Sequence, residues 1–187
     1  MNKQNLTLKE AMILGTQHQQ KGNLKAAKKI YEDILKINPN HAESIFLLGS
    51  LFVQTKNFDR AKQLLNKAIQ IQPNFIAAHY NLGNVQHELG ELEKALSSYQ
   101  KAIEIQPNYA SAHHNLGYLL SDLGKYDEAT AACRQAIKIK PNFVGAYYNL
   151  GNAYDEQDKY EEAIEAYNKA IEIMSNDAES YINLGYA

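Results

Sequence analysis

The 187-residue chain contains one cysteine, no tryptophan and only four prolines. A single cysteine cannot form an internal disulfide, which favours a reducing compartment over a secreted protein. The apolar run near the N-terminus spans only residues 11–14, too short for a signal peptide. No stretch approaches the roughly 18 apolar residues of a membrane span. These absences predict a cytoplasmic protein that does not enter a membrane.

Strong charge of either sign is also missing, because the net charge is only −2. Domains that bind nucleic acid, or anionic membrane surfaces, normally carry a clearly basic face. The sequence contains no glycine-rich phosphate loop, no HExxH motif and no serine nucleophile elbow. We therefore predict no nucleic-acid or membrane partner, no cofactor, no metal and no enzymatic activity.

The few prolines are placed with strict regularity, each 34 residues after the last: Pro39, Pro73, Pro107 and Pro141. The same interval separates glycines Gly15, Gly49, Gly83, Gly117, Gly151 and Gly185, and alanines Ala27, Ala61, Ala95, Ala129 and Ala163. A fixed period of this length is the signature of a repeat protein. The predicted copies, after a lead-in of residues 1–7, are 8–41, 42–75, 76–109, 110–143, 144–177 and a partial 178–187.

Each copy is predicted to form two helices. In the fifth copy the first helix is marked by Tyr147, Leu150 and Tyr154, which share one helical face, and the second by Ala163. Proline at the end of a copy stops the second helix, because it cannot donate to the helical ladder. Thr7 and Glu10 have the spacing of a capping box at the start of the first helix.

Glycine occurs at two kinds of position within a copy. Gly90 and Gly124 lie between the two helices, where a left-handed residue can end the first one. The periodic glycines lie inside the first helix, where each costs about 1 kcal/mol relative to alanine. We therefore predict a tight helix crossing at these positions, pairing glycine with the periodic alanine, as in Gly15 with Ala27 and Gly117 with Ala129.

The copies resemble the tetratricopeptide repeat, whose pattern is aromatic-x2-Leu-Gly-x2-aromatic, then Ala, aromatic, Ala and Pro. The resemblance implies an all-α, right-handed superhelical solenoid of antiparallel helix pairs, with five full repeats and the first helix of a sixth. First helices would line its concave side. This sequence departs from the pattern at His79 and His113 in the first aromatic position, Cys133 in a tyrosine position and Ser175 in place of proline. We interpret these as packing variants, with Cys133 buried and not a nucleophile.

A second face of the first helices lies away from the packing stripe and carries no lysine or arginine in copies three to five. Its asparagine column comprises Asn81, Asn115, Asn149 and Asn183. Beside the column are Tyr80, Asn84, His87, His114, Tyr118, Tyr148 and Asn152. Asparagine offers both a donor and an acceptor, so the column can bond the amides of an extended peptide. It can equally serve as a structural bond between adjacent copies, and the sequence leaves both roles open.

The repeat arm of the O-linked N-acetylglucosamine transferases has a similar asparagine ladder on its concave side. The N-terminal copies differ, because their equivalent face is apolar: Met12, Ile13, Phe46, Leu47 and Val53. Such a patch usually marks a contact site. It would accept an apolar side chain of a ligand, an N-terminal segment or a second protomer.

We therefore predict a protein–protein interaction module that binds an extended peptide or protein segment in its concave groove, as a scaffold or targeting protein. Glu88, Asp122, Asp155 and Glu156 make the groove mildly acidic, which favours a neutral to basic partner. One alternative is the substrate-recruiting arm of a larger enzyme, such as a glycosyltransferase. Another is a structural protein that self-associates through its terminal repeats.

Overall fold

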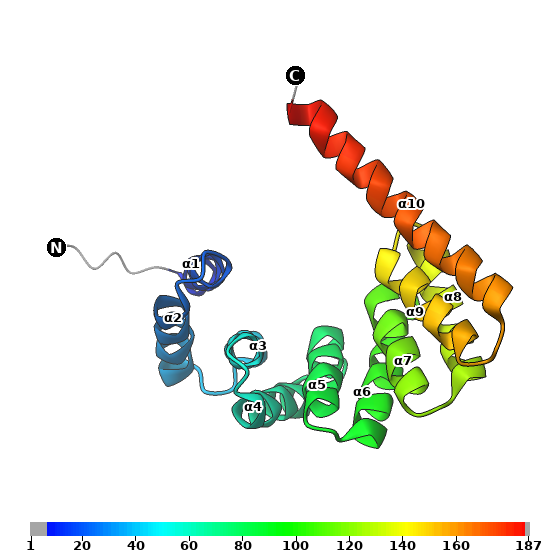
Figure 1. The fold of residues 1–187 in the computed structure, drawn as a ribbon. Coiled ribbons are helices and arrows are strands. Elements are labelled where there is room, and N and C mark those ends of the chain that lie inside the picture. Colours follow the sequence, from blue (N-terminus) through cyan, green and yellow to red (C-terminus); the bar gives the residue numbers. More distant parts are fainter. Residues whose placement is uncertain (1–6, 186–187) are drawn as a thin grey trace. The chain divides into compact units, whose positions relative to one another are not determined.

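The structure, a computed structural model, describes residues 7–185, with side chains for residues 7–175. Most of the predicted lead-in, residues 1–6, and the last two residues of the partial sixth copy lie outside the described residues. The described part of the chain consists of helices joined by short turns, and it contains no strand (Figure 1). The all-α prediction is therefore confirmed.

Helices of two kinds alternate along the chain. The first helices of the copies are α1 (Leu8–Gln20), α3 (Ala42–Gln54), α5 (Ile76–Glu88), α7 (Ala110–Asp122) and α9 (Val144–Asp155). The second helices are α2 (Leu24–Ile37), α4 (Phe58–Ile71), α6 (Leu92–Ile105), α8 (Tyr126–Ile139) and α10 (Tyr160–Gly185). Within each kind, every helix begins 34 residues after the previous one. Short turns between contacting helices produce the predicted antiparallel pairs.

The chain divides into two compact units, residues 1–91 and 92–187, although the 34-residue period predicts a single solenoid over residues 8–187. In the first unit α1 contacts α3 and α3 contacts α5, in addition to the contacts between helices adjacent in sequence. In the second unit α7 contacts α9. Within neither unit do the described second helices contact one another. First helices therefore lie side by side along one face of each unit.

The ends of the helices follow the predicted local signals. The second helices of the first four copies end two residues before their proline. At α1, Glu10 N–H donates to Thr7 Oγ1, and the Glu10 carboxylate accepts from Thr7 N–H at 2.8 Å. Gly90 and Gly124 have φ of 71° and 70°, as expected for a left-handed turn. Gly22, Lys56 and Asp158 occupy the same position in their copies, also with positive φ.

Helix α10 departs from the expected pattern. The sequence predicts a new helix over residues 178–187, but α10 runs without a break from Tyr160 to Gly185 (Figure 1). In the preceding copies a proline interrupts the chain at the matching position, and here Ser175 replaces it. Because serine retains its backbone N–H, the helical ladder continues through the point where the other copies turn.

The periodic glycines allow close approach of the second helix, and the nearest atoms belong to a larger residue than the predicted alanine. A Cβ on Gly15 would lie 2.5 Å from Tyr31 Cε1, and one on Gly117 would lie 2.6 Å from Cys133 Sγ. Gly151 faces the Tyr167 ring in the same way. The nearest atom therefore does not belong to the periodic alanine, although a Cβ on Gly117 would also lie 3.2 Å from the Ala129 carbonyl oxygen, in line with the predicted pairing. The partner lies one helical turn beyond that alanine, on the same face of the second helix.

Candidate functional site

A polar cleft of about 230 Å³ lies in the second unit, where α7 and α9 run side by side and α8 begins. Its lining residues are Tyr118, Ser121, Asp122, Tyr126, Asn149, Asn152, Asp155 and Glu156. Three of them were predicted site residues: Tyr118, Asn149 and Asn152. Tyr126 was missed, because it opens a second helix and the sequence analysis considered only first helices.

Asn149 is the most deeply placed of these residues. Its side chain is buried, with the residue only 8% exposed, yet it lines the cleft. It makes no hydrogen bond to any of the described residues. Buried polar side chains are nearly always hydrogen-bonded to protein or to ordered water. Asn149 therefore lines the cleft with a side chain that is largely buried, and its ligand contact stays a prediction.

Other polar groups around the cleft have partners within the second unit. Asn152 Oδ1 accepts a hydrogen bond from the Tyr167 hydroxyl at 2.7 Å, which leaves its amide donors for other contacts. The Glu156 carboxylate accepts from the Tyr126 hydroxyl at 3.1 Å, and this bond raises the pKa of Tyr126. Ser121 Oγ is buried without a hydrogen-bond partner. The cleft therefore contains acceptors that are already hydrogen-bonded, such as the Glu156 carboxylate, and one without a partner, Ser121 Oγ.

His114 and Asn115 lie together at the start of α7. His114 Nδ1 is 2.8 Å from Asn115 Oδ1, and its ring packs on Phe143 with centroids 4.7 Å apart. Burial lowers the pKa of His114, so the imidazole is neutral at pH 7. A Cβ on Gly145 would lie 2.8 Å from His114 Nε2, so this glycine lets the ring approach α9. His114 thus has a packing role, and its predicted ligand contact stays a prediction.

The predicted peptide-binding residues of the first unit all lie on α5: Tyr80, Asn81, Asn84 and His87. All four are half-buried. Asn183 falls in α10, but its side chain lies outside the described residues. Tyr148, on α9, is 56% exposed, and its ring centroid lies 5.8 Å from that of Tyr167. The structure therefore brings only part of the predicted set into one cleft.

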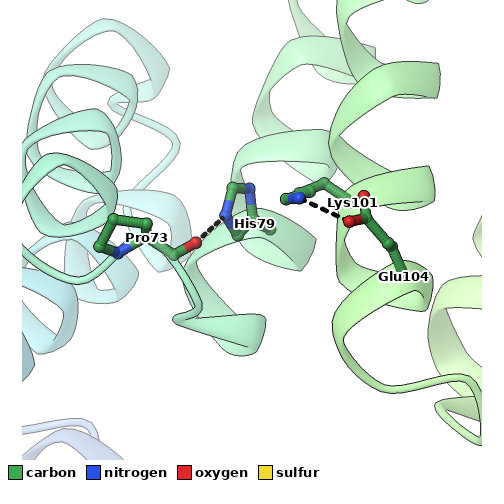
Figure 2. A network of polar contacts seen from close by, with 4 residues as sticks. All are labelled: Pro73, His79, Lys101 and Glu104. Carbon is green, nitrogen blue, oxygen red and sulfur yellow. Dashed lines mark hydrogen bonds and ion pairs between the residues drawn. The ribbon is translucent and has the colours of Figure 1, made fainter.

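The histidines in the aromatic position belong to the packing of their copies. His79 is buried, and its Nε2 donates to the Pro73 carbonyl oxygen at 2.8 Å (Figure 2). His113 Nε2 makes the equivalent bond to Pro107 O at 2.9 Å. Each ring therefore ties the first helix to the turn that precedes it, which confirms the packing interpretation for His79 and His113. Figure 2 also shows an exposed ion pair between Lys101 and Glu104 on α6.

The predicted N-terminal apolar patch lies partly along a groove and partly against the core of the first unit. Met12, Ile13 and Leu47 line an open groove of about 900 Å³. Phe46 instead packs on Phe75, with ring centroids 4.7 Å apart, and joins the apolar core of the first unit. Val53 packs against the same core.

Cys133 is completely buried, and burial raises the pKa of its thiol to about 12. Only the thiolate is a good nucleophile, so we expect the native protein to resist iodoacetamide at pH 8 over hours. In denaturant the same thiol should react within minutes, as judged by intact mass. Rapid modification of the folded protein would contradict the burial of Cys133.

The described residues show no further chemical centre. Nowhere among them do three or more histidine, cysteine, aspartate or glutamate side chains gather in a way that could hold a metal ion. Within the same part of the chain, none of the helices has both the length and the apolar character needed to cross a membrane.

Comparisons with known proteins agree with the repeat architecture. The family model described as Tetratricopeptide repeat matches residues 144–177, and that described as TPR repeat matches 86–123 and 117–158. The model of Anaphase-promoting complex, cyclosome, subunit 3 matches residues 17–102. None of the curated protein sequences matches this chain.

Several solved structures are similar. A crystal structure of MamA shares 30% identity and a TM-score of 0.81, covering 88% of this chain and 96% of MamA. YrrB, described as a TPR protein with an unusual peptide-binding site, shares 26% identity and a TM-score of 0.73, covering 88% of this chain and 84% of YrrB. MamA from Desulfovibrio magneticus RS-1 has the same fold at 19% identity and a TM-score of 0.81. The match covers 90% of this chain and 95% of that MamA chain. On the repeat period, the helix pairs and these matches, the chain belongs to the tetratricopeptide repeat family.

Proposed function

We propose that this protein is a non-catalytic scaffold that binds an extended segment of a partner protein along its first helices. The cleft between α7 and α9 carries the proposal, because Asn149, a residue only 8% exposed, lines it with a side chain that has no hydrogen bond to the described residues. An asparagine amide can bond both the N–H and the C=O of an extended main chain, whatever the side chains of that peptide are.

Two further observations support this proposal. The cleft is lined by polar and aromatic side chains, a composition typical of adaptable peptide contacts. YrrB, a solved relative with the same helix arrangement, is described as having a peptide-binding site. No observation on the described residues favours a recruiting arm of an enzyme or assembly through terminal repeats. The cytoplasmic location stays a prediction from the single cysteine.

Replacing Asn149 with alanine tests this proposal. We expect binding to peptides selected from a random display library to weaken about fivefold, since a hydrogen bond is worth about 1 kcal/mol. Fluorescence anisotropy with the selected peptides measures the loss. Asn168→Ala is the matched control, because Asn168 is exposed on α10 and distant in sequence from the cleft residues.

The same variant separates the two roles left open by the sequence. A structural asparagine would lower the midpoint of urea denaturation when it is removed, whereas Asn149 has no hydrogen bond to lose. We expect an unchanged midpoint together with weaker peptide binding. Lost stability with unchanged affinity would overturn the proposed role of Asn149.

A further inference from the structure

The cleft is acidic as well as polar. Asp122, Asp155 and Glu156 are three of its eight lining residues, and no lysine or arginine is among them. The carboxylates come from the last turn of α7 and the last turn of α9 and its cap. A helix C-terminus already carries partial negative charge, so both ends add to the negative potential of the cleft. A cationic group is therefore the complementary ligand.

Aromatic rings flank these carboxylates. Tyr118 is 46% exposed and lines the cleft, and Tyr126 lines it from the start of α8. A cation placed over a tyrosine face gains additional attraction. Of the two basic side chains, arginine suits such surroundings better, because its planar guanidinium stacks on rings and loses its hydration more readily than an ammonium group.

The hydrogen-bond acceptors of the cleft also favour arginine. A guanidinium carries five N–H donors in one plane and satisfies several acceptors at once. Ser121 Oγ is buried without a hydrogen-bond partner in the described residues. The side chain of Asn149, a residue only 8% exposed, also has no hydrogen bond to the described residues. The two groups line the same cleft and are independent of the carboxylates. They indicate that the cleft binds a ligand and is not only a cluster of acidic side chains on the surface.

We propose that the cleft of α7 and α9 binds an arginine side chain of the extended partner segment, with the Asn149 amide bonding the adjacent main chain. This inference rests on the proposed function and specifies its partner. The partner segment is thus one with an arginine flanked by neutral residues. An acidic segment would be repelled by the same carboxylates.

The test uses nine-residue peptides of alanine and serine, with blocked termini and a central arginine, lysine or glutamine. Binding is followed by ¹⁵N–¹H correlation spectra of the whole chain, which detect millimolar affinities. We expect the arginine peptide to bind at least tenfold more tightly than the glutamine peptide, with lysine between them. Shifts should be largest for the amides around Asn149 and Asp155. The arginine preference should also weaken as salt is raised, because ions screen exposed charges.

Asp155→Asn and, separately, Glu156→Gln should each reduce the arginine preference at least threefold. Glu172→Gln is the matched control, because it removes the same charge from an exposed site on α10 outside the cleft. Circular dichroism checks that each variant is folded. Two independent cleft variants keep the test valid if one of them fails to fold.

The outcomes distinguish the inference from the proposed function. Equal binding of the arginine and glutamine peptides would overturn the inference, while leaving peptide binding itself intact. Equal binding of arginine and lysine would overturn the choice of a guanidinium. Failure of every peptide, including those from the random library, would overturn the proposed function as well.

Discussion

Replacing Gly117 with valine is expected to lower the free energy of unfolding by about 3 kcal/mol, at the upper end of the usual cost of overpacking. Even a Cβ at this position would lie 2.6 Å from Cys133 Sγ and 3.2 Å from the Ala129 carbonyl oxygen. The second neighbour is backbone, so α7 and α8 must move apart to admit the side chain. Urea denaturation followed by circular dichroism measures the loss.

A double-mutant cycle identifies the cause of the Gly117 effect. Alanine at position 117 combines a gain of about 1 kcal/mol in helix propensity with the cost of the clash. Cys133→Ala removes the sulfur atom, so Gly117→Ala should be better tolerated in that background than in the wild type. Rescue should be incomplete, because the Ala129 carbonyl oxygen remains. Equal costs in both backgrounds would show that Gly117 and Cys133 are not in contact.

Replacing Tyr31 with alanine is expected to cost about 4 kcal/mol, comparable to other large-to-small changes at aromatic core residues. Tyr31 is completely buried, and its ring lies against Gly15 at the crossing of α1 and α2. Removing the ring leaves a cavity, because the glycine opposite has no side chain with which to fill it. The same denaturation experiment measures the change.

Tyr31→Phe is the matched control for this substitution. It keeps the ring and removes only the hydrogen bond from the Tyr31 hydroxyl to Gln19 Oε1, which is 3.0 Å long. We expect a cost of about 1 kcal/mol. If phenylalanine were as damaging as alanine, the hydroxyl and not the packing of the ring would account for the stability of this crossing.

The repeat architecture was predictable because its signals are local. A proline ends a helix wherever it lies, so Pro73 and Pro107 mark helix ends without reference to the rest of the molecule. Gly90 and Gly124 likewise mark left-handed turns. The capping box of Thr7 and Glu10 depends only on residues three apart. The 34-residue period made each such signal appear several times.

The candidate site was predictable only in part. Helical spacing placed Asn149 and Tyr118 on one face of their helices, and both residues line the cleft. It could not show that Tyr126, from a second helix, reaches the same cleft. It also could not distinguish Asn152, which accepts a hydrogen bond from Tyr167, from Asn149, which has no partner. Whether a side chain reaches the cleft or finds a hydrogen-bond partner depends on which helix packs against its own.

The sequence by itself determined the helices, their order and most of their ends, because proline, glycine and caps act over a few residues. Only the tertiary structure decided which side chain meets each periodic glycine, which amide is buried without a partner and that α10 continues past Ser175. The physical reason is that the repeat period and helix propensity determine which face of its own helix a side chain occupies. Its burial and its hydrogen-bond partners depend instead on the atoms of a neighbouring helix.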